Sequence, residues 1–217
     1  MINFKTYSQA SGKNALRLAK IAETISVKRN VLVAVAPQIA DIFQIANNVK
    51  IPLFAQHIDA IKAGRNTGYI LPENVKAAGA KGALVNHSEH QLSEDEIKNT
   101  VECARNVELL SLVCVDAPKK AAQVARFKPD MIAIEPPELI GTGISVSKAK
   151  PEVITLGLQS VKEVDPEIIF LCGAGISGGE DAALSIKLGV KGLLLASGFV
   201  KAKNPSQVLE EIVNAVV

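Results

Sequence analysis

The sequence contains no tryptophan, and cysteine and histidine occur only three times each among its 217 residues. The cysteines are odd in number and form no Cys-x-x-Cys pair, which is typical of reduced, mostly buried thiols in a cytoplasmic protein. The histidines, His57, His87 and His90, are too few and too unevenly spaced to predict a metal site. A disulfide framework and a zinc site are therefore not expected.

An excess of one charge and long apolar runs are also lacking. The formal net charge is +2, which is too small to indicate a nucleic-acid or membrane-surface partner. No apolar run approaches the roughly 18 residues that a membrane helix needs. The chain opens directly with strand-like residues, so we expect no signal peptide. Hydrophobic residues make up 48% and charged residues 21% of the chain, so we expect a packed core.

Short apolar runs rich in valine, isoleucine, leucine and alanine recur at nearly even intervals. They do not alternate between apolar and polar residues, which is typical of strands covered on both faces, as parallel strands are. The predicted strands are residues 2–4, 31–36, 53–56, 83–86, 109–113, 131–135, 168–172 and 192–196.

Segments with helical periodicity lie between these runs. Residues 15–25 place Leu18, Ile21, Ala22 and Ile25 on one face. Residues 93–105 begin with Ser93, and Glu96 follows at the position that completes a capping box. The remaining helix signals are prolines suited to a first turn, Pro151 and Pro205, and glycines suited to a C-terminal cap, Gly79 and Gly189.

Together these segments form eight β-then-α units of about 27 residues each, with no Gly/Ser linker and no shift in composition. Eight such units predict a closed (β/α)8 barrel, an α/β fold, as a single domain over residues 1–217. The chain has 217 residues, which is close to the lower limit of roughly 200 residues for such barrels, so we expect a compact, short form. An open doubly wound sheet is the alternative. Against it, no G-x-G-x-x-G follows the first strand, and the units are many for such a sheet.

Barrel enzymes carry their chemistry at the C-terminal ends of the strands. At the end of the first strand, alternation sends Asn3 and Lys5 to the same face. A lysine directed into a barrel mouth indicates an anionic ligand, because burying an unpaired charge is costly; a surface lysine is the alternative. His87 ends the fourth strand, before a short helical turn predicted to start at Ser88. A helix N-terminus disfavours the imidazolium, so we expect a neutral histidine, although a structural role is the alternative.

Glu135 closes the sixth predicted strand. A carboxylate at the end of an apolar strand should have a raised pKa, which suits a general base; a solvated loop acid is the alternative. Residues 136–143 follow, with two prolines at one end and two glycines near the other, a composition that predicts a hinged lid rather than an ordinary turn. Small residues after the seventh and eighth strands, at 173–176 and 196–198, let backbone N–H groups approach a phosphate.

Five segments between residues 3 and 198 resemble the motifs of one family, in the same order. They are Asn3-Phe4-Lys5, Asn86-His87-Ser88-Glu89, the run from Glu135 to Gly143, Gly173-Ala174-Gly175-Ile176 and Leu195-Ala196-Ser197-Gly198. In these five motifs the chain resembles the triosephosphate isomerases, in their archaeal form. It departs from that pattern at His90-Gln91, where many relatives carry basic residues, and it lacks the lid tryptophan of many bacterial and eukaryotic members.

The resemblance implies a TIM barrel that interconverts dihydroxyacetone phosphate and D-glyceraldehyde 3-phosphate by proton transfer through an enediolate. It implies Glu135 as the base and neutral His87 as hydrogen-bond donor to the substrate oxygens. Lys5 would supply positive charge and Asn3 would orient the substrate. Backbone groups of Ile140, Gly175, Ala196 and Ser197 would bind the phosphate, and the lid would consist of Pro136, Pro137, Glu138, Leu139, Ile140, Gly141, Thr142 and Gly143.

The resemblance also implies no metal or organic cofactor, and a cytoplasmic enzyme of glycolysis and gluconeogenesis. We expect a homo-oligomer, with a tetramer favoured over a dimer because archaeal members are often tetramers. Residues 57–68 would then reach into a neighbour, with Thr67 at the tip of the loop. Two other functions stay open, namely another phosphate-binding barrel isomerase and a non-catalytic sugar-phosphate-binding barrel.

Overall fold

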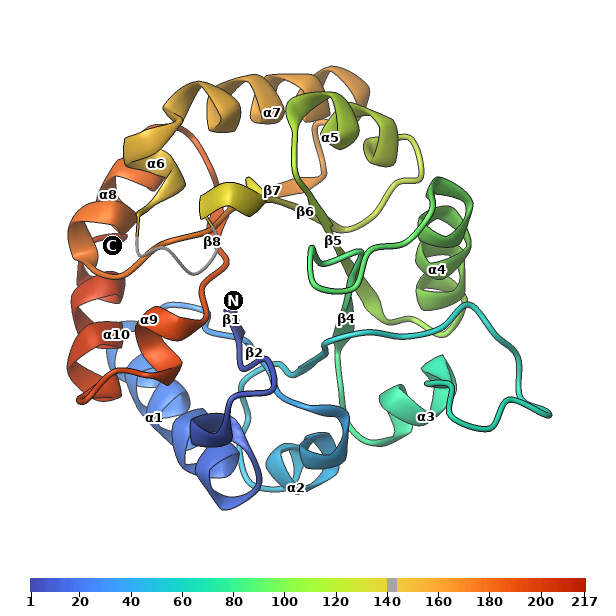
Figure 1. Ribbon diagram of the computed structural model, residues 1–217. Coiled ribbons are helices and arrows are strands. Elements are labelled where there is room, and N and C mark those ends of the chain that lie inside the picture. Colours follow the sequence, from blue (N-terminus) through green and yellow to red (C-terminus); the bar gives the residue numbers. More distant parts are fainter. Residues whose placement is uncertain (140–143) are drawn as a thin grey trace.

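A computed structural model of the chain describes residues 1–139 and 144–217. Its parallel strands follow one another around a curled sheet, and the helices form a ring outside them (Figure 1). Six strands pair in sequence order: β3 (Phe54–Ala55), β4 (Gly82–Val85), β5 (Leu110–Val115), β6 (Met131–Ile134), β7 (Ile169–Cys172) and β8 (Gly192–Leu193). The first two strands, β1 (Ile2–Asn3) and β2 (Val35–Ala36), pair with each other.

Helical segments connect the strands and cover the outside of the sheet. The α-helices are α1 (Lys13–Arg29), α2 (Ile42–Ala46), α3 (Pro72–Ala77), α4 (Glu94–Asn106), α5 (Pro118–Ala125), α6 (Val146–Ala149), α7 (Pro151–Val164), α8 (Gly179–Lys187), α9 (Ser197–Val200) and α10 (Pro205–Asn214). Three short 3-10 turns are η1 (Ser8–Ala10), η2 (Ile39–Asp41) and η3 (Pro137–Leu139). Within the two described stretches, no helix is both long and apolar enough to cross a membrane.

The predicted helix ends are confirmed by local hydrogen bonds and backbone angles. The Ser93 hydroxyl accepts a hydrogen bond from the Glu96 N–H, and the Glu96 carboxylate accepts one from the Ser93 N–H, which is a complete capping box. Prolines occupy the first turns of α7 and α10 as predicted. Gly79 and Gly189 follow α3 and α8 with φ angles of 101° and 97°, which a residue with a Cβ adopts only with strain.

Several strands are shorter than their apolar runs predict. The run 31–36 forms a ladder only at Val35–Ala36, and the run 2–4 only at Ile2–Asn3. The prediction was wrong in extent because an apolar run reports burial, whereas a ladder also needs a neighbouring strand in register. Val33 and Phe4 are buried beside their strands without extending them.

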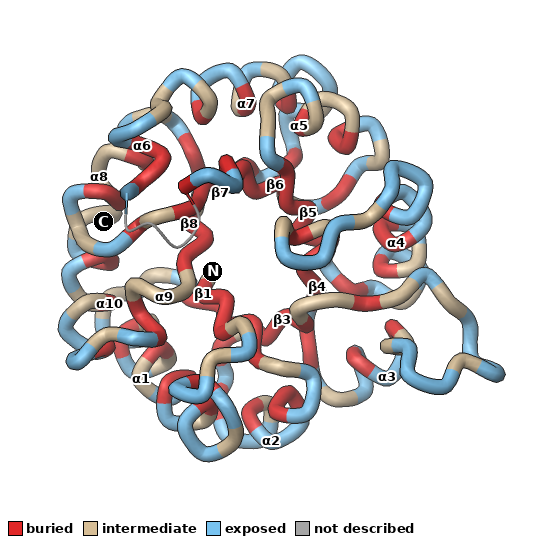
Figure 2. Tube along the Cα trace, in the orientation of Figure 1, coloured by how far each residue is buried: buried red, intermediate tan, exposed pale blue. Residues whose placement is uncertain are grey.

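Successive side chains along each strand point to opposite faces of the sheet, and they therefore form two separate apolar clusters. On β6, Ile132 and Ile134 pack outward against the helices, while Ala133 belongs to a smaller cluster on the concave face of the sheet. On β7, Phe170 packs outward and Leu171 inward in the same way. Buried residues consequently line both the strands and the inner sides of the helices (Figure 2). The concave side is filled by side chains, so ligands can enter only at an end of the sheet.

Candidate active site

The carboxyl ends of the strands surround a cavity of about 180 Å³. The lining includes seven of the predicted site residues, which the fold brings together from opposite ends of the sequence: Asn3, Lys5, His87, Glu135, Gly175, Ala196 and Ser197. The predicted phosphate contact Ile140 and the lid residues Gly141, Thr142 and Gly143 lie outside the described residues. The predicted lid begins with Pro136, Pro137, Glu138 and Leu139, which follow Glu135 after the end of β6. Glu138 pairs with Lys150.

Glu135 continues from the end of β6, held by a 2.8 Å hydrogen bond from its N–H to the Val115 carbonyl. Its side chain is buried, and burial raises the pKa of the carboxyl group to about 7. The charge of Lys5 and a hydrogen bond with the Cys114 thiol act in the opposite direction and are outweighed. Among the described residues, no hydrogen-bond donor reaches Oε2 of Glu135. The prediction of a raised pKa is confirmed, and the solvated-acid alternative is wrong.

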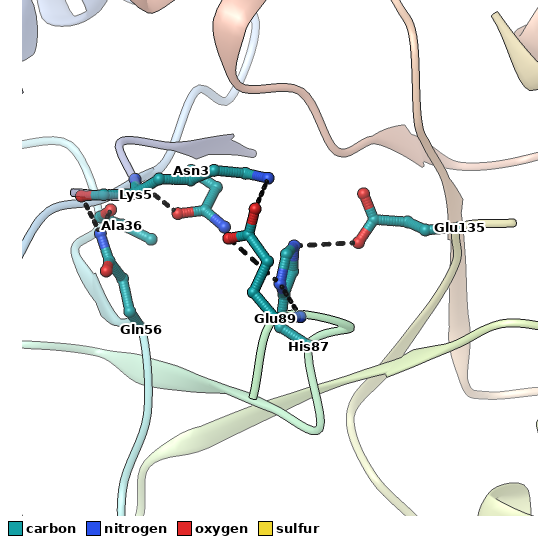
Figure 3. Close-up of polar contacts among 7 residues, drawn as sticks. All are labelled: Asn3, Lys5, Ala36, Gln56, His87, Glu89 and Glu135. Carbon is teal, nitrogen blue, oxygen red and sulfur yellow. Dashed lines mark hydrogen bonds and ion pairs between the residues drawn. The ribbon is translucent and has the colours of Figure 1, made fainter. Parts of the chain in front are cut away.

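His87 follows β4 and is also buried. Its Nδ1 accepts a hydrogen bond from the Glu89 N–H at 3.2 Å, so in the neutral ring the proton lies on Nε2. Nε2 in turn faces Glu135, 3.6 Å from Oε2 (Figure 3). Burial is the first cause that lowers the pKa of His87 to about 4, and the Lys5 charge is the second. The imidazole is therefore a neutral hydrogen-bond donor at neutral pH.

The short turn predicted to begin at Ser88 is present, but a helix N-terminus is not the cause of the low pKa of His87. Ser88 and Glu89 form a turn closed by a 2.7 Å hydrogen bond from the His90 N–H to the His87 carbonyl, and not the start of a helix. A single turn has no macrodipole of the kind that a helix presents. The low pKa of His87 comes from burial and from Lys5 instead.

Lys5 reaches the cavity from a backbone in the left-handed region, with φ of 47°. Strand alternation therefore does not continue to Lys5, although Asn3 and Lys5 both line the cavity as predicted. The Lys5 N–H donates to Oδ1 of Asn3 at 2.9 Å, and Gln56 donates to the Lys5 carbonyl at 2.9 Å (Figure 3). The ammonium contacts Glu89 at 2.7 Å, and the Lys5 side chain is only 10% exposed. The alternative of a surface lysine is wrong.

The glycines of the two predicted phosphate loops are required by close backbone approach. A Cβ on Gly175, where φ is 76°, would lie 1.9 Å from the Ile144 carbonyl oxygen. A Cβ on Gly173 would lie 2.8 Å from Oε1 of Glu135, and one on Gly198 would lie 2.7 Å from the Ile176 carbonyl oxygen. The loop after β7 therefore packs on both the carboxylate and the loop after β8.

These loops also leave donors available. No hydrogen bond within the described chain uses the backbone N–H groups of Gly175, Ala196 or Ser197. All three residues line the cavity. N–H groups of this kind, together with the Lys5 ammonium, are the donors that a phosphate group needs.

Several residues with contacts in the site had no assigned role in the sequence-based prediction. Glu89 pairs with Lys5 and orients His87 through its N–H, and Cys114 contacts Glu135. Gln56 bridges the Lys5 and Ala36 carbonyls. Glu89 could have been found because it lies two residues from His87, whereas only a known strand register places Cys114 beside Glu135. Within residues 1–139 and 144–217, no group of three or more His, Cys, Asp or Glu side chains is arranged to hold a metal ion.

A curled parallel sheet ringed by helices, with its polar cavity at the carboxyl ends of the strands, fits the α/β TIM-barrel class of enzymes. A profile of the family described as "Triosephosphate isomerase" matches residues 1–216. Relatives named triosephosphate isomerase include those of Methanothermus fervidus, 48% identical over 98% of this chain and 96% of the relative, and Methanocaldococcus jannaschii, 46% identical over 100% and 99%. That of Methanosarcina mazei is 44% identical over 100% of this chain and 97% of the relative. The chain belongs to the triosephosphate isomerase family, which confirms the resemblance found in its motifs.

Proposed function

We propose that this protein is a triosephosphate isomerase that interconverts dihydroxyacetone phosphate and D-glyceraldehyde 3-phosphate. The observation that carries the proposal is the pairing of His87 and Glu135, 3.6 Å apart, in one cavity with Lys5. An ionisable carboxylate beside a neutral imidazole is the pair that proton transfer next to a carbonyl requires.

In the proposed reaction, Glu135 takes a proton from carbon 1 of dihydroxyacetone phosphate and returns it to carbon 2. A base with a pKa of about 7 combines a useful ionised fraction with a real affinity for the proton at neutral pH. The Nε2–H of His87 donates to the substrate oxygens and stabilises the enediolate. Because Glu135 is buried, the enediolate forms in a setting where these interactions are stronger than in water.

The phosphate is proposed to bind between Lys5 and the two glycine-containing loops. The N–H groups of Gly175, Ala196 and Ser197 supply neutral donors, and Lys5 supplies positive charge to both the phosphate and the developing oxyanion. Asn3 supports this arrangement because its Oδ1 holds the Lys5 backbone. Ile140, by the family resemblance, adds a further N–H from the lid of residues 136–143.

We further propose that residues 1–217 form one closed (β/α)8 barrel. Two parallel bridges support closure, Ile2 with Leu195 and Val35 with Leu53, since they join the β1–β2 pair to both ends of the six-stranded sheet. The Met1 amino group adds a 2.8 Å hydrogen bond to the Leu193 carbonyl on the same side.

For assembly we propose a homo-oligomer, with a tetramer favoured over a dimer, in the cytoplasm. Ile39 and Tyr69 expose 46% and 62% of their surface. Ile39 also lines a second cavity of about 540 Å³ that borders Lys5 and His87. An exposed apolar side chain such as Ile39 in the wall of this cavity suits the insertion of residues 57–68 from a neighbour. Light scattering of the purified protein tests this, and a monomer would contradict it.

A coupled assay with D-glyceraldehyde 3-phosphate, following dihydroxyacetone phosphate, tests the activity. We expect fast turnover that Glu135→Ala abolishes. A non-catalytic sugar-phosphate-binding barrel would bind the substrate and return it unchanged. A different phosphate-binding isomerase would leave this substrate untouched while acting on another sugar phosphate.

A further inference from the structure

A group of buried polar side chains lies outside the catalytic residues, where residues 144–149 meet the loop after β7 and the start of α8. Its centre is Asp181, which is only 5% exposed. Oδ2 of Asp181 accepts two hydrogen bonds from Ser177, from the N–H at 3.1 Å and from the hydroxyl at 3.0 Å. Oδ1 of Asp181 lies 3.0 Å from the Lys148 ammonium. A buried carboxylate with this many donors fixes the position of each of them.

The same group reaches the segment that precedes α6. The buried hydroxyl of Ser147 donates to the Asp181 carbonyl at 3.2 Å, and it lies 3.1 Å from the hydroxyl of Ser145. Burial raises the pKa of Asp181, but hydrogen bonds from Ser177, Lys148 and Ser145 outweigh burial and hold the pKa below its ordinary value. The carboxylate is therefore charged at neutral pH and binds both segments at once.

Backbone contacts connect residues 144–146 to the loop after β7, which lines the cavity. The Val146 N–H donates to the Ala174 carbonyl at 3.2 Å, and Gly175 packs against Ile144 so closely that no Cβ fits. Ser177 lines the cavity. The carbonyl oxygen of the preceding residue, Ile176, packs against Gly198 in the loop after β8. A displacement of Ser177 would therefore move the backbone of both loops that face the cavity.

We propose that Asp181 is a positioning residue that locks residues 144–148 to the loop after β7 and thereby sets the backbone N–H groups that receive the phosphate. The proposal rests on the function proposed above for this cavity. Asp181 does not touch the substrate. It holds the Ser177 N–H and hydroxyl on its own carboxylate, and in this way it keeps the preceding Gly175, whose N–H is unused, at the wall of the cavity.

The alternative is a purely stabilising role, in which the group only secures α8 and α6. Both roles lower the melting temperature when the group is broken. Only the positioning role changes the affinity for a phosphate group in a protein that remains folded. Phosphate affinity is therefore the measurement that separates the two.

The test compares Asp181→Asn with the full-length wild type, with inorganic phosphate as the probe and calorimetry as the readout. Breaking a charge-assisted network should weaken phosphate binding about tenfold, because each hydrogen bond to a charged group contributes roughly the free energy of a tenfold change. KM for D-glyceraldehyde 3-phosphate should rise by a similar factor, while slow turnover of phosphate-free D-glyceraldehyde should stay unchanged. Glu180→Gln is the matched control, because Glu180 is an exposed partner of the same Lys148 ammonium and should leave phosphate affinity unchanged.

A folded Asp181→Asn with the wild-type phosphate dissociation constant would overturn the proposal, as would equal losses with D-glyceraldehyde and its phosphate. If that variant does not fold, Lys148→Met removes only the half-exposed cation, and it should weaken phosphate binding about threefold; no change would again overturn the proposal. Calorimetry needs no turnover. A wild type that binds phosphate but does not isomerise the triose phosphate would refute the proposed function and leave the positioning role to be decided by the variant.

Discussion

Nε2 of His87 lies 3.6 Å from Oε2 of Glu135, and burial acts on the two groups in opposite directions. Removal from water disfavours both charged forms, so it raises the pKa of Glu135 to about 7 and lowers that of His87 to about 4. Lys5 favours the carboxylate and disfavours the imidazolium, since it adds a positive charge near both. The burial of the site and one lysine thus place a carboxyl group that ionises near neutral pH beside a neutral imidazole.

The first prediction concerns the pH dependence of turnover. If ionised Glu135 is the base, kcat/KM of the wild type should decline as the pH falls through about 7, tenfold for each further pH unit. His87 should add no change until about pH 4. A pH–rate profile on D-glyceraldehyde 3-phosphate between pH 5 and 9 measures this, after correction for the ionisation of the substrate phosphate. A flat profile down to pH 5 would remove Glu135 from the mechanism.

The second prediction concerns the stability cost of keeping that base buried. The folded-state pKa of Glu135 is raised, so the folded protein holds its proton more tightly than the unfolded chain. Its contribution to stability is complete below pH 4.5 and is lost as the pH rises through about 7. Glu135→Gln has no such loss. The free energy of unfolding of the variant relative to the wild type should therefore rise by roughly 3 kcal/mol between pH 4.5 and pH 8. Urea unfolding at both pH values measures it, and a difference of opposite sign would contradict burial as the cause.

The order of the elements and several residues that line the cavity could be predicted because each depends on short-range information. An apolar run indicates a buried strand, and a strand end in a barrel indicates the catalytic face, which was enough to select Glu135 and His87. Contacts between distant segments could not be predicted in this way. Asp181 is an ordinary acidic residue in the first turn of α8, and only the fold shows that its carboxylate meets Lys148 in the segment after residue 143.

The route by which Lys5 enters the site was also beyond the sequence pattern. Alternation put Asn3 and Lys5 on one face, yet Lys5 has a left-handed backbone that an L-residue adopts only when its surroundings compensate. That compensation comes from Asn3 and from Gln56, which lies 51 positions away in the chain. A local pattern carries no information about such a partner.

The third prediction concerns Lys5. Lys5→Met removes the charge and keeps the apolar stem. The pKa of His87 should then rise from about 4 toward its ordinary value. It should not reach that value, because burial is the larger cause of the low pKa and remains in the variant. The Glu89 carboxylate, which loses its cation, adds to the rise. NMR titration of the imidazole measures the shift. Lys13→Met on the exposed face of α1 is the control, and an unchanged His87 pKa in Lys5→Met would show that Lys5 does not act on the imidazole.

The same variant should weaken phosphate binding. Competitive inhibition by inorganic phosphate should decline by about tenfold or more in Lys5→Met, as expected for loss of a charge-assisted hydrogen bond. Inorganic phosphate should inhibit the control Lys13→Met as strongly as it inhibits the wild type. Unchanged inhibition in Lys5→Met would place the phosphate elsewhere in the cavity.

The fourth prediction concerns the reach of the base. Glu135→Asp keeps the carboxylate but withdraws it by about 1 Å, which should slow turnover by roughly a hundredfold or more. Substrate binding should change little, because the shorter side chain leaves Lys5 and the loop N–H groups in place. Steady-state kinetics with a phosphate-bearing inhibitor as a binding control separates kcat from affinity. Near-normal kcat would mean that another group takes the proton.

The last prediction uses two glycines that lie three positions apart in one loop. Gly175 has φ of 76° and packs on the Ile144 carbonyl, whereas Gly178 is extended, with φ of −163°, and has open space where a Cβ would lie. Gly175→Ala should therefore force the loop away from residues 144–145. We expect this to lower the free energy of unfolding by about 1–3 kcal/mol. It should also raise KM for the triose phosphate at least about tenfold. Gly178→Ala should stay within about 0.5 kcal/mol of wild type and retain its KM. Thermal unfolding and kinetics on both variants measure this, and equal effects of the two substitutions would show that close packing at Gly175 does not shape the phosphate site.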